Sequence, residues 1–407
     1  MLISTPITNN NRYQYILFIA LCFFFAVRLL IGNNIVKTKL TIIDLIPVII
    51  TSIWLCGLLI GFILGNSVQS IFSNFAGMTV YLFYYFLLIE KVTKEWIFRV
   101  IYISSLLCIF ITSINLLKNM GRLAQISVAP GLYRLTYSEA SYVISITVAV
   151  LLLSFFANKK DYSYYFNKKE IPFSKSKLIR FIFLLLGIYF VAFGPASKGF
   201  LLGFLFILLV LPITYFLRYM LFFRLYKKIF LFILALILCF FTISFSRYKQ
   251  LTIDIFSLSE ISNAVRFEQT KYLLKELSIF GKGLGASLES GYKRDDLGYG
   301  FEVTYINLIH KFGILSIFIF FFYFFTIFKS IRNIFHGREL KYSAAALGAM
   351  CYLFVAIGNP VLFSPTCSIL HCLALYLIRN IYGVEGPNKK WGIKANTNLV
   401  RAMHSFT

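Results

Sequence analysis

Arg266 and Glu302 are the residues of this sequence best suited to do chemistry. Both lie between residues 246 and 313, the longest interval without a strongly apolar run, which mixes Arg, Lys, Asp, Glu and Gly. The planar guanidinium of Arg266 suits the oxygens of a phosphate or pyrophosphate, the alternative being a solvated surface arginine. Glu302 or His310 can serve as a general base. We favour Glu302, because a lone histidine near the end of an apolar run is more often structural.

Three further charged residues stand where apolar runs begin. Arg134 and Glu139 lie in LYRLTYSEASY, at the mouth of an expected span. A charged side chain costs about 2.5–3.5 kcal/mol at the centre of the bilayer, so Glu139 is expected to be functional or to form an interfacial ion pair that orients the helix. Lys198, in GPASKGFLLG, opens another span, where a cation opposes the helix dipole. It is either a substrate-binding residue or a topology anchor.

A helix followed by a glycine-rich turn is expected between Arg266 and Glu302. Apolar residues recur near a 3.6-residue period over 263–280, which predicts an amphipathic helix lying on the membrane surface or over a cavity. The apolar positions are Val265, Tyr272, Leu273, Leu277 and Phe280. The GKGLG segment that follows, 281–285, is predicted to be a flexible turn in which Gly283 and Gly285 shape the functional loop. It lacks the strand and helix context of a nucleotide-binding loop.

Long apolar runs supply the elements that must position these residues. The chain is 59% hydrophobic and only 14% charged, whereas a soluble domain carries roughly 25% charged residues. The sequence therefore predicts an all-α, polytopic integral membrane protein with about eleven transmembrane helices. The expected spans are 13–31, 41–64, 71–89, 97–117, 138–157, 178–194, 199–217, 229–246, 304–328, 343–358 and 365–382. They form one domain, 1–382, with an external loop 247–303 and a basic cytoplasmic tail 383–407.

The distribution of Lys and Arg predicts the orientation in the membrane. Loops rich in basic residues alternate with short loops, 65–70 and 359–364, that have neither Lys nor Arg. The basic loops are 37–39, 91–94, 159–180, 218–228 and 329–341. The positive-inside rule places these loops and the C-terminus in the cytoplasm, and the N-terminus and the long loop outside. We expect a bacterial inner-membrane protein whose working side is external.

Other function classes fit the composition less well. The net charge of +24 is explained by cytoplasmic loops, so nucleic-acid binding is not expected. The seven cysteines all fall inside apolar runs, without a CxxC motif or zinc spacing, and are read as small buried hydrophobes. No His, Asp or Glu cluster has metal-ligand spacing, which predicts a metal-independent mechanism without a cofactor.

The order of these features resembles the O-antigen polymerase and O-antigen ligase superfamily of bacterial envelope glycosyltransferases. The resemblance lies in many spans, one long external loop late in the chain, and an Arg shortly before a G-x-G turn, here Arg266 and GKGLG. It also includes RLTYSEAS at 134–141 (R…E-x-S), ASKG at 196–199 (S-[KR]-G), Glu302 before YINLIHKFGIL at 305–315 (y-x-n-l-x-x-x-x-G), and the late break NP at 359–360. It covers roughly residues 120–365.

The resemblance implies a substrate and roles for the candidate residues. Such enzymes are similar in using undecaprenyl-pyrophosphate-linked oligosaccharides on the periplasmic face, without nucleotide sugars or metals. It implies that Arg266, with Arg134 and Lys198, holds the donor pyrophosphate and stabilises its departure. Glu302 or Glu139 would then deprotonate the acceptor sugar hydroxyl. Membrane lipid and a chain-length regulator protein are the further partners implied.

Three functions remain open at this stage. Ligases, which transfer the finished glycan to lipid A–core, typically place a His-Asn pair where this chain has Glu302 and Val303. This difference favours a polymerase of O-antigen or capsule, involved in lipopolysaccharide or other polysaccharide biosynthesis. A flippase of the same lipid-linked sugar is the non-enzymatic alternative. A transporter should show repeats and charges spread along a transmembrane path, whereas the polar residues here cluster on one face.

Overall fold

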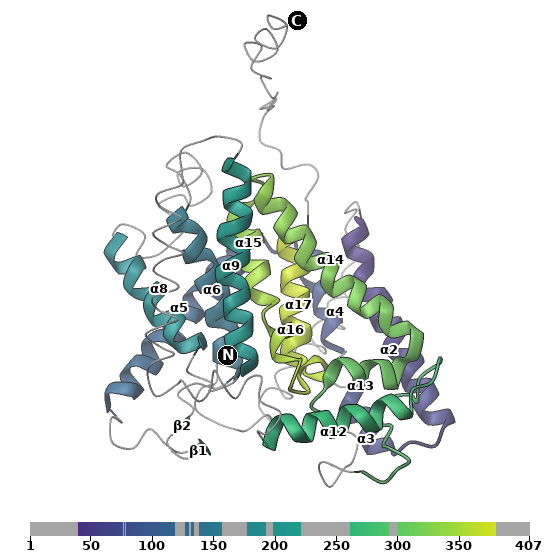
Figure 1. Ribbon diagram of the computed structural model, residues 1–407. Helices are drawn as coiled ribbons and strands as arrows, with labels where there is room; N and C mark the ends of the chain where they lie inside the picture. Colours follow the sequence, from purple (N-terminus) through teal and green to yellow (C-terminus); the bar gives the residue numbers. More distant parts are fainter. Residues whose placement is uncertain are drawn as a thin grey trace, which may run out of the picture.

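The protein is described by a computed structural model that is almost entirely helical (Figure 1). The structure describes residues 40–75, 77, 79–118, 127–129, 132–133, 138–156, 177–192, 198–220, 261–292 and 300–379. Apart from a short antiparallel pair, β1 (Ser127–Ala129) and β2 (Leu132–Tyr133), the regular elements among these residues are helices. The predicted all-α class is therefore confirmed for this part of the chain.

Within the described part of the chain, four helical stretches are long and apolar enough to cross a membrane. These segments are Ile42–Ile63, Lys94–Ile114, Gly199–Leu217 and Thr304–Phe335. They belong to α2 (Ile42–Ile63), α5 (Lys94–Lys118), α9 (Lys198–Met220) and the pair α13 (Thr304–Phe312) and α14 (Ser316–Phe335). Shorter apolar helices are α6 (Ser138–Phe156), α8 (Lys177–Ala192), α15 (Leu340–Ala349) and α17 (Pro365–Ile378). The helices are compatible with a multi-pass membrane protein.

The total of about eleven spans stays a prediction. The expected spans 13–31 and 229–246 and the tail 383–407 lie outside the described residues. Two expected spans are interrupted, so their prediction as continuous helices was wrong. The span 71–89 is divided into α3 (Val68–Phe75), η1 (Thr79–Tyr81) and α4 (Leu82–Ile89), and the span 343–358 into α15 and α16 (Tyr352–Val355). An apolar composition does not reveal these turns, because the residues that make them are themselves apolar.

A further break, at Gly313, separates α13 from α14 within the expected span 304–328, which lies in the apolar helical stretch Thr304–Phe335. Gly313 has a φ of +54°, and a Cβ there would lie 2.0 Å from the carbonyl oxygen of Ile279. The next residue, Ile314, donates its backbone N–H to the same oxygen at 2.8 Å. A residue with a side chain cannot occupy this position without a shift of the backbone. The break lets α13 turn across the end of the bundle instead of continuing the line of α14 (Figure 1).

Small residues allow the central helices to approach closely. All ten residues of α15 are buried, and a Cβ on Gly348 would lie 2.7 Å from the carbonyl oxygen of Ser145 in α6. Gly199 brings α9 equally close to α16, since its Cβ would lie 2.6 Å from the Cα of Val355. Such small-residue crossings are typical of helices packed within membranes. They fix the starts of α6 and α9 relative to the segment that follows α16.

Helices α12 (Ile261–Lys275) and α13 pack together across one end of the bundle (Figure 1). The helix predicted over 263–280 thus exists, but its predicted end is wrong by five residues, because the chain from 276 turns back toward the break at Gly313. The start of α2 lies at the opposite end. Between Asp44 and Gly61, α2 rises about 26 Å at 1.5 Å per residue, which separates the two ends.

Candidate functional site

Arg266 and Glu302, nominated separately from the sequence, form an ion pair. The Nε atom of Arg266 lies 2.8 Å from Oε2 of Glu302, and the side chains are 23% and 14% exposed. Arg266 lies in α12, and Glu302 directly precedes α13. The sequence suggested an interfacial ion pair for Glu139 but did not predict this one. A guanidinium and a carboxylate that meet while both keep access to solvent can exchange partners with an incoming ligand.

The buried side of α12 holds this pair in place. Gln269, one turn after Arg266, is fully buried, and its Oε1 accepts the backbone N–H of Glu302 at 2.9 Å. Leu273, one turn further, packs in a small apolar cluster with Phe301 and Val303. The segment that carries Glu302 is therefore fixed to α12 on both sides of the carboxylate.

The late break of the chain forms the third wall of the site. A Cβ on Gly358 would lie 2.8 Å from Nε and 3.0 Å from Cζ of Arg266, so the guanidinium lies against the glycine backbone. Next to it, Thr304 donates its hydroxyl to the carbonyl of Asn359. The NP segment, 359–360, thus lies beside the ion pair although about 57 residues separate it from Glu302 in the chain. The NP motif predicted a helix break here, but not that the break would lie beside the Arg266–Glu302 ion pair.

The starts of α6 and α9 lie at the same end of the bundle. The rings of Tyr142 and Phe200 are 4.8 Å apart, which places the first turns of the two helices side by side. Glu139 and Lys198 belong to these first turns. Through Gly199, the start of α9 also packs against the backbone at Val355, three residues before Gly358. The side chains of Glu139 and Lys198, and all of Arg134, lie outside the described residues.

The GKGLG segment is locked, which corrects the prediction of a flexible turn. Gly281, Gly283 and Gly285 all have φ between +74° and +77°, and a Cβ on any of them would meet backbone atoms of α13, α2 or α3 at 2.3, 2.2 or 2.7 Å. Backbone N–H groups of 282 and 283 donate to the carbonyls of 310 and 311 at 2.8 and 3.0 Å. The amide of Asn66 donates to two carbonyls of the segment at 2.9 Å. The segment is a structural clamp joining three helices.

His310 and Lys311 lie beneath this clamp. Both are 0% exposed, and Nζ of Lys311 donates to Oδ1 of Asn74 at 2.8 Å. The same Asn74 oxygen accepts the N–H of Gly285 at 3.1 Å. Burial separates His310 from solvent, whereas the side chain of Glu302 is 14% exposed. A surface pair completes the clamp: Lys282 binds Glu289 at 2.6 Å, and this ammonium lowers the pKa of the Glu289 carboxyl.

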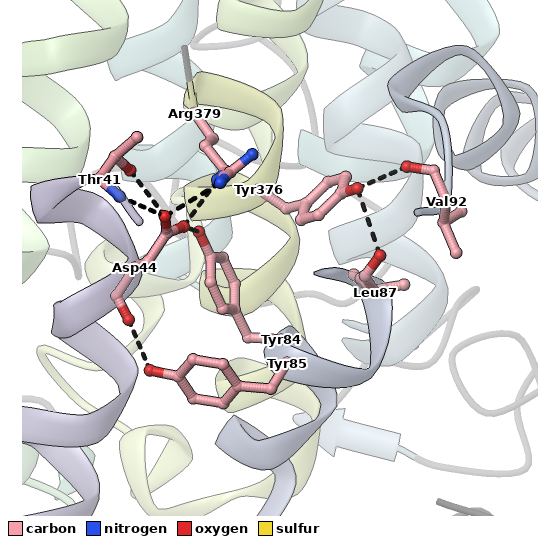
Figure 2. Close-up of polar contacts among 8 residues, drawn as sticks. All are labelled: Thr41, Asp44, Tyr84, Tyr85, Leu87, Val92, Tyr376 and Arg379. Carbon is pink, nitrogen blue, oxygen red and sulfur yellow. Dashed lines mark hydrogen bonds and ion pairs between the residues drawn. The ribbon is translucent and has the colours of Figure 1, made fainter. Parts of the chain in front are cut away.

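A second buried charge cluster, which the sequence analysis did not predict, lies at the opposite end of the bundle (Figure 2). Asp44, in the first turn of α2, accepts from Nε of Arg379 at 2.7 Å and from Nη2 at 3.1 Å. The hydroxyl of Tyr84 and the backbone N–H of Thr41 also donate to this carboxylate, at 2.5 and 2.6 Å. Two isolated charges at span ends on the same predicted side of the membrane were the signal available in the sequence.

Among the described residues, no group of three or more His, Cys, Asp or Glu side chains is placed to hold a metal ion. Comparison of the chain with protein-family models, with curated proteins and with solved structures finds no match. The site must therefore be interpreted from its own geometry.

Proposed function

We propose that the protein is a polymerase of a surface polysaccharide, either O-antigen or capsule. It transfers a glycan from undecaprenyl pyrophosphate onto a lipid-linked repeat unit at the external face of the bacterial inner membrane. The observation that carries the proposal is the partly exposed Arg266–Glu302 ion pair at one end of an apolar helical bundle. An anion-binding group adjacent to a carboxylate, beside hydrocarbon, suits a substrate that combines a pyrophosphate, a sugar hydroxyl and a polyprenyl tail.

The two charges have complementary roles in this proposal. In the free protein Glu302 occupies the guanidinium of Arg266. The donor pyrophosphate competes for Arg266, because phosphate oxygens accept the same charge-assisted hydrogen bonds. Glu302 can then face the acceptor sugar.

The transfer step follows from these positions. Glu302 accepts the proton of the acceptor hydroxyl, whose oxygen bonds to the anomeric carbon of the donor sugar. The bond between that carbon and the pyrophosphate oxygen breaks, and its electron pair leaves with undecaprenyl pyrophosphate. Arg266 stabilises this charge, with Lys198 and Arg134 as the further cations and Glu139 as the alternative base.

A gel of surface polysaccharide from a deletion strain tests the proposal. The strain is complemented with the wild type, Arg266→Ala, Arg266→Lys, or the control Arg332→Ala, an exposed arginine in α14 near the opposite end. We expect wild type and Arg332→Ala to restore the ladder of long chains. Arg266→Ala should leave core bearing one repeat unit at an unchanged protein level, with the polymer reduced about 10²–10³-fold. Arg266→Lys should restore only part of the ladder, because lysine lacks the planar fork.

Two other phenotypes of the deletion strain would overturn the proposal. Long polymer made on the lipid carrier but absent from the core identifies a ligase. Single lipid-linked units trapped on the cytoplasmic side identify a flippase, and the roles given to Arg266 and Glu302 would then be wrong.

A further inference from the structure

The outer side of α12 and the chain that follows it present large apolar side chains to the surroundings. Phe267 and Leu274 lie on the side of α12 opposite the buried Gln269, and both are more than half exposed. Beyond the helix, Ile279 is 71% and Phe280 77% exposed. We call Phe267, Leu274, Ile279 and Phe280 the apolar rim. Leaving four such side chains in water is unfavourable by roughly 1.5–3 kcal/mol each relative to full burial.

The apolar rim continues into the lipid-facing surface of the bundle. The carbonyl of Ile279 accepts the N–H of Ile314, which lies in the short 3-10 helix η2 (Gly313–Leu315) that leads into α14. From there an exposed stripe follows α14. It consists of Ile314, Ile317, Phe318, Phe321, Phe324 and Phe328. Its spacing of three and four residues forms one helix face. The rim is thus the end of a surface that already has the character of a membrane contact.

Helices α2 and α3 carry a second exposed apolar surface, which lies on the other side of the GKGLG clamp from the apolar rim. Phe62, at the end of α2, and Phe72, in α3, are exposed, and their rings pack edge to face at 6.2 Å. The GKGLG clamp joins these helices to the segment that carries Ile279, since Gly283 lies against Gly61 and Gly285 against Ile71. Apolar surface therefore extends along one level of the molecule, on both sides of the clamp.

The charges beside the apolar rim suit a lipid headgroup layer. Lys271 and Lys275 are exposed on α12, and Lys282 is 32% exposed next to Ile279 and Phe280. The exposed acidic residues of the same segment are Glu268 and Glu289, of which Glu289 is paired with Lys282. Lysine stems can lie along apolar surface while their ammonium groups reach the phosphates. Apolar and polar residues are little segregated around α12 itself, so the position at the interface rests on the exposed rim side chains, on their continuity with α14 and on the lysines beside them.

We infer that α12 and residues 276–282 lie in the boundary between headgroups and acyl chains of the bilayer, with the apolar rim immersed in it. The occupant of this surface is thus phospholipid, and the other face of α12 covers α13. This decides between the two positions that the sequence left open for the helix. If the proposed function is also correct, Arg266 lies at the depth of lipid phosphates, and a lipid-linked pyrophosphate reaches it by lateral diffusion.

Quenching of tryptophan fluorescence by brominated lipids tests the inference without any activity. The full-length chain is reconstituted at one copy per nanodisc, with lipids brominated near the headgroup end of the acyl chain. The variants are Phe280→Trp, Phe267→Trp and Ile279→Trp, with Ser290→Trp, exposed in the same loop, as the matched control. The wild-type signal is subtracted, because the chain has three native tryptophans. We expect at least about twofold stronger quenching of the rim tryptophans than of Ser290→Trp.

Two outcomes would overturn the inference. Rim tryptophans that are quenched no more than Ser290→Trp would place α12 in water. Tryptophans shielded only when nanodiscs hold two or more copies, and insensitive to bromine, would make the apolar rim an interface between copies of this chain. Since the readout is depth, either result leaves the proposed polymerase to be judged by its own experiment.

Discussion

The two ion pairs at opposite ends of the bundle, Asp44–Arg379 and Arg266–Glu302, are built for different tasks. The side chains of Asp44 and Arg379 are 0% and 8% exposed, and the carboxylate accepts from Thr41, Tyr84 and both sides of the guanidinium fork. The side chains of Arg266 and Glu302 are 23% and 14% exposed. A buried charge surrounded by donors has no capacity left for a ligand. A pair that solvent can reach can exchange one partner for a substrate.

Burial and a complete set of hydrogen-bond partners, rather than charge alone, thus distinguish a structural ion pair from one that can bind a ligand. Asp44 ties the start of α2 to the end of α17, where Tyr84 and Tyr376 also meet edge to face at 6.0 Å (Figure 2). Arg266 instead packs against the backbone at Gly358 and keeps 23% of its side chain exposed, so its guanidinium is not enclosed by donors and acceptors as the Asp44 cluster is.

Glu302→Gln should have the largest effect on activity. The amide keeps the size of the side chain but cannot accept the proton, so we expect about 10²–10⁴-fold less polymer with an unchanged protein level. Polymer is quantified from gels, and protein from membranes. Glu268→Gln, an exposed position on the neighbouring α12, is the control and should retain the full ladder. Normal polymer from Glu302→Gln would assign the base to another residue, with Glu139 next in line.

Asp44→Ala should have the largest effect on stability. It leaves Arg379 buried without its carboxylate, which costs about 3–5 kcal/mol. Unfolding in detergent should show this loss, whereas Arg266→Ala should cost about 1 kcal/mol, because its partner keeps access to water. The Asp44→Ala protein that does fold should polymerise at the wild-type rate per molecule. A specific activity as low as that of Glu302→Gln would contradict the assignment of this cluster to the scaffold.

Gly283→Ala should destabilise the clamp beside the site. The left-handed conformation costs an alanine about 1–2 kcal/mol, and the clash with the backbone of α2 adds roughly 1–3 kcal/mol. Gly291→Ala is the matched control, since its φ is +76° but nothing lies within 4 Å of the added Cβ. The difference between the free energies of unfolding of the two variants, measured with denaturant, gives the cost of the clash alone, because the strain of positive φ is common to both. Equal stabilities would show that the segment yields, as the sequence-based prediction of a flexible turn implied.

Gly358→Ala should disturb the site without unfolding it. The new methyl group meets the Arg266 side chain, which can shift, so the free energy of unfolding should change by less than about 1 kcal/mol. Moving the guanidinium relative to Glu302 should reduce polymer formation several-fold. Gly348→Ala, whose Cβ would meet the backbone of α6 at 2.7 Å, should show the reverse pattern, with lost stability and normal activity per folded molecule.

The smallest effect concerns the pH dependence of the surface pair in the clamp. Lys282 lowers the pKa of Glu289 in the folded protein, so the pair stabilises the fold at neutral pH, and this contribution disappears as the pH falls through the folded pKa. Between neutral pH and about pH 3, the melting temperature of wild type should therefore fall slightly more than that of Glu289→Gln. If the melting temperatures of the two proteins fell equally with pH, the Lys282–Glu289 pair would not contribute to the stability of the clamp.

The helical class was predictable from the sequence, because long apolar runs indicate it. Arg266 and Glu302 stood out as charges beside expected helices, and their role in a site stays a prediction. Their contact was not predictable, because it depends on the break at Gly313, which directs α13 back under α12. Hydropathy does not detect such a break within an apolar run.

The conformation of the GKGLG glycines was also not predictable from their local sequence. GKGLG suggests flexibility when read alone, since glycine adopts many conformations. Its rigidity comes from Gly61, Asn66 and Ile71, more than 200 residues away along the chain. Likewise, the sequence placed Asp44 and Arg379 at span ends on the same predicted side of the membrane, but nothing in it marks which of several span ends would meet.

The crowding around GKGLG also has a genetic consequence. Any single-base change in a glycine codon that alters the amino acid introduces a residue with a Cβ. At Gly281, Gly283 and Gly285 that carbon meets backbone atoms and the residue is also strained by its positive φ, whereas at Gly291 only the strain applies. In a mutagenised library, missense variants at the first three codons should therefore be depleted together, and those at the fourth should be depleted less.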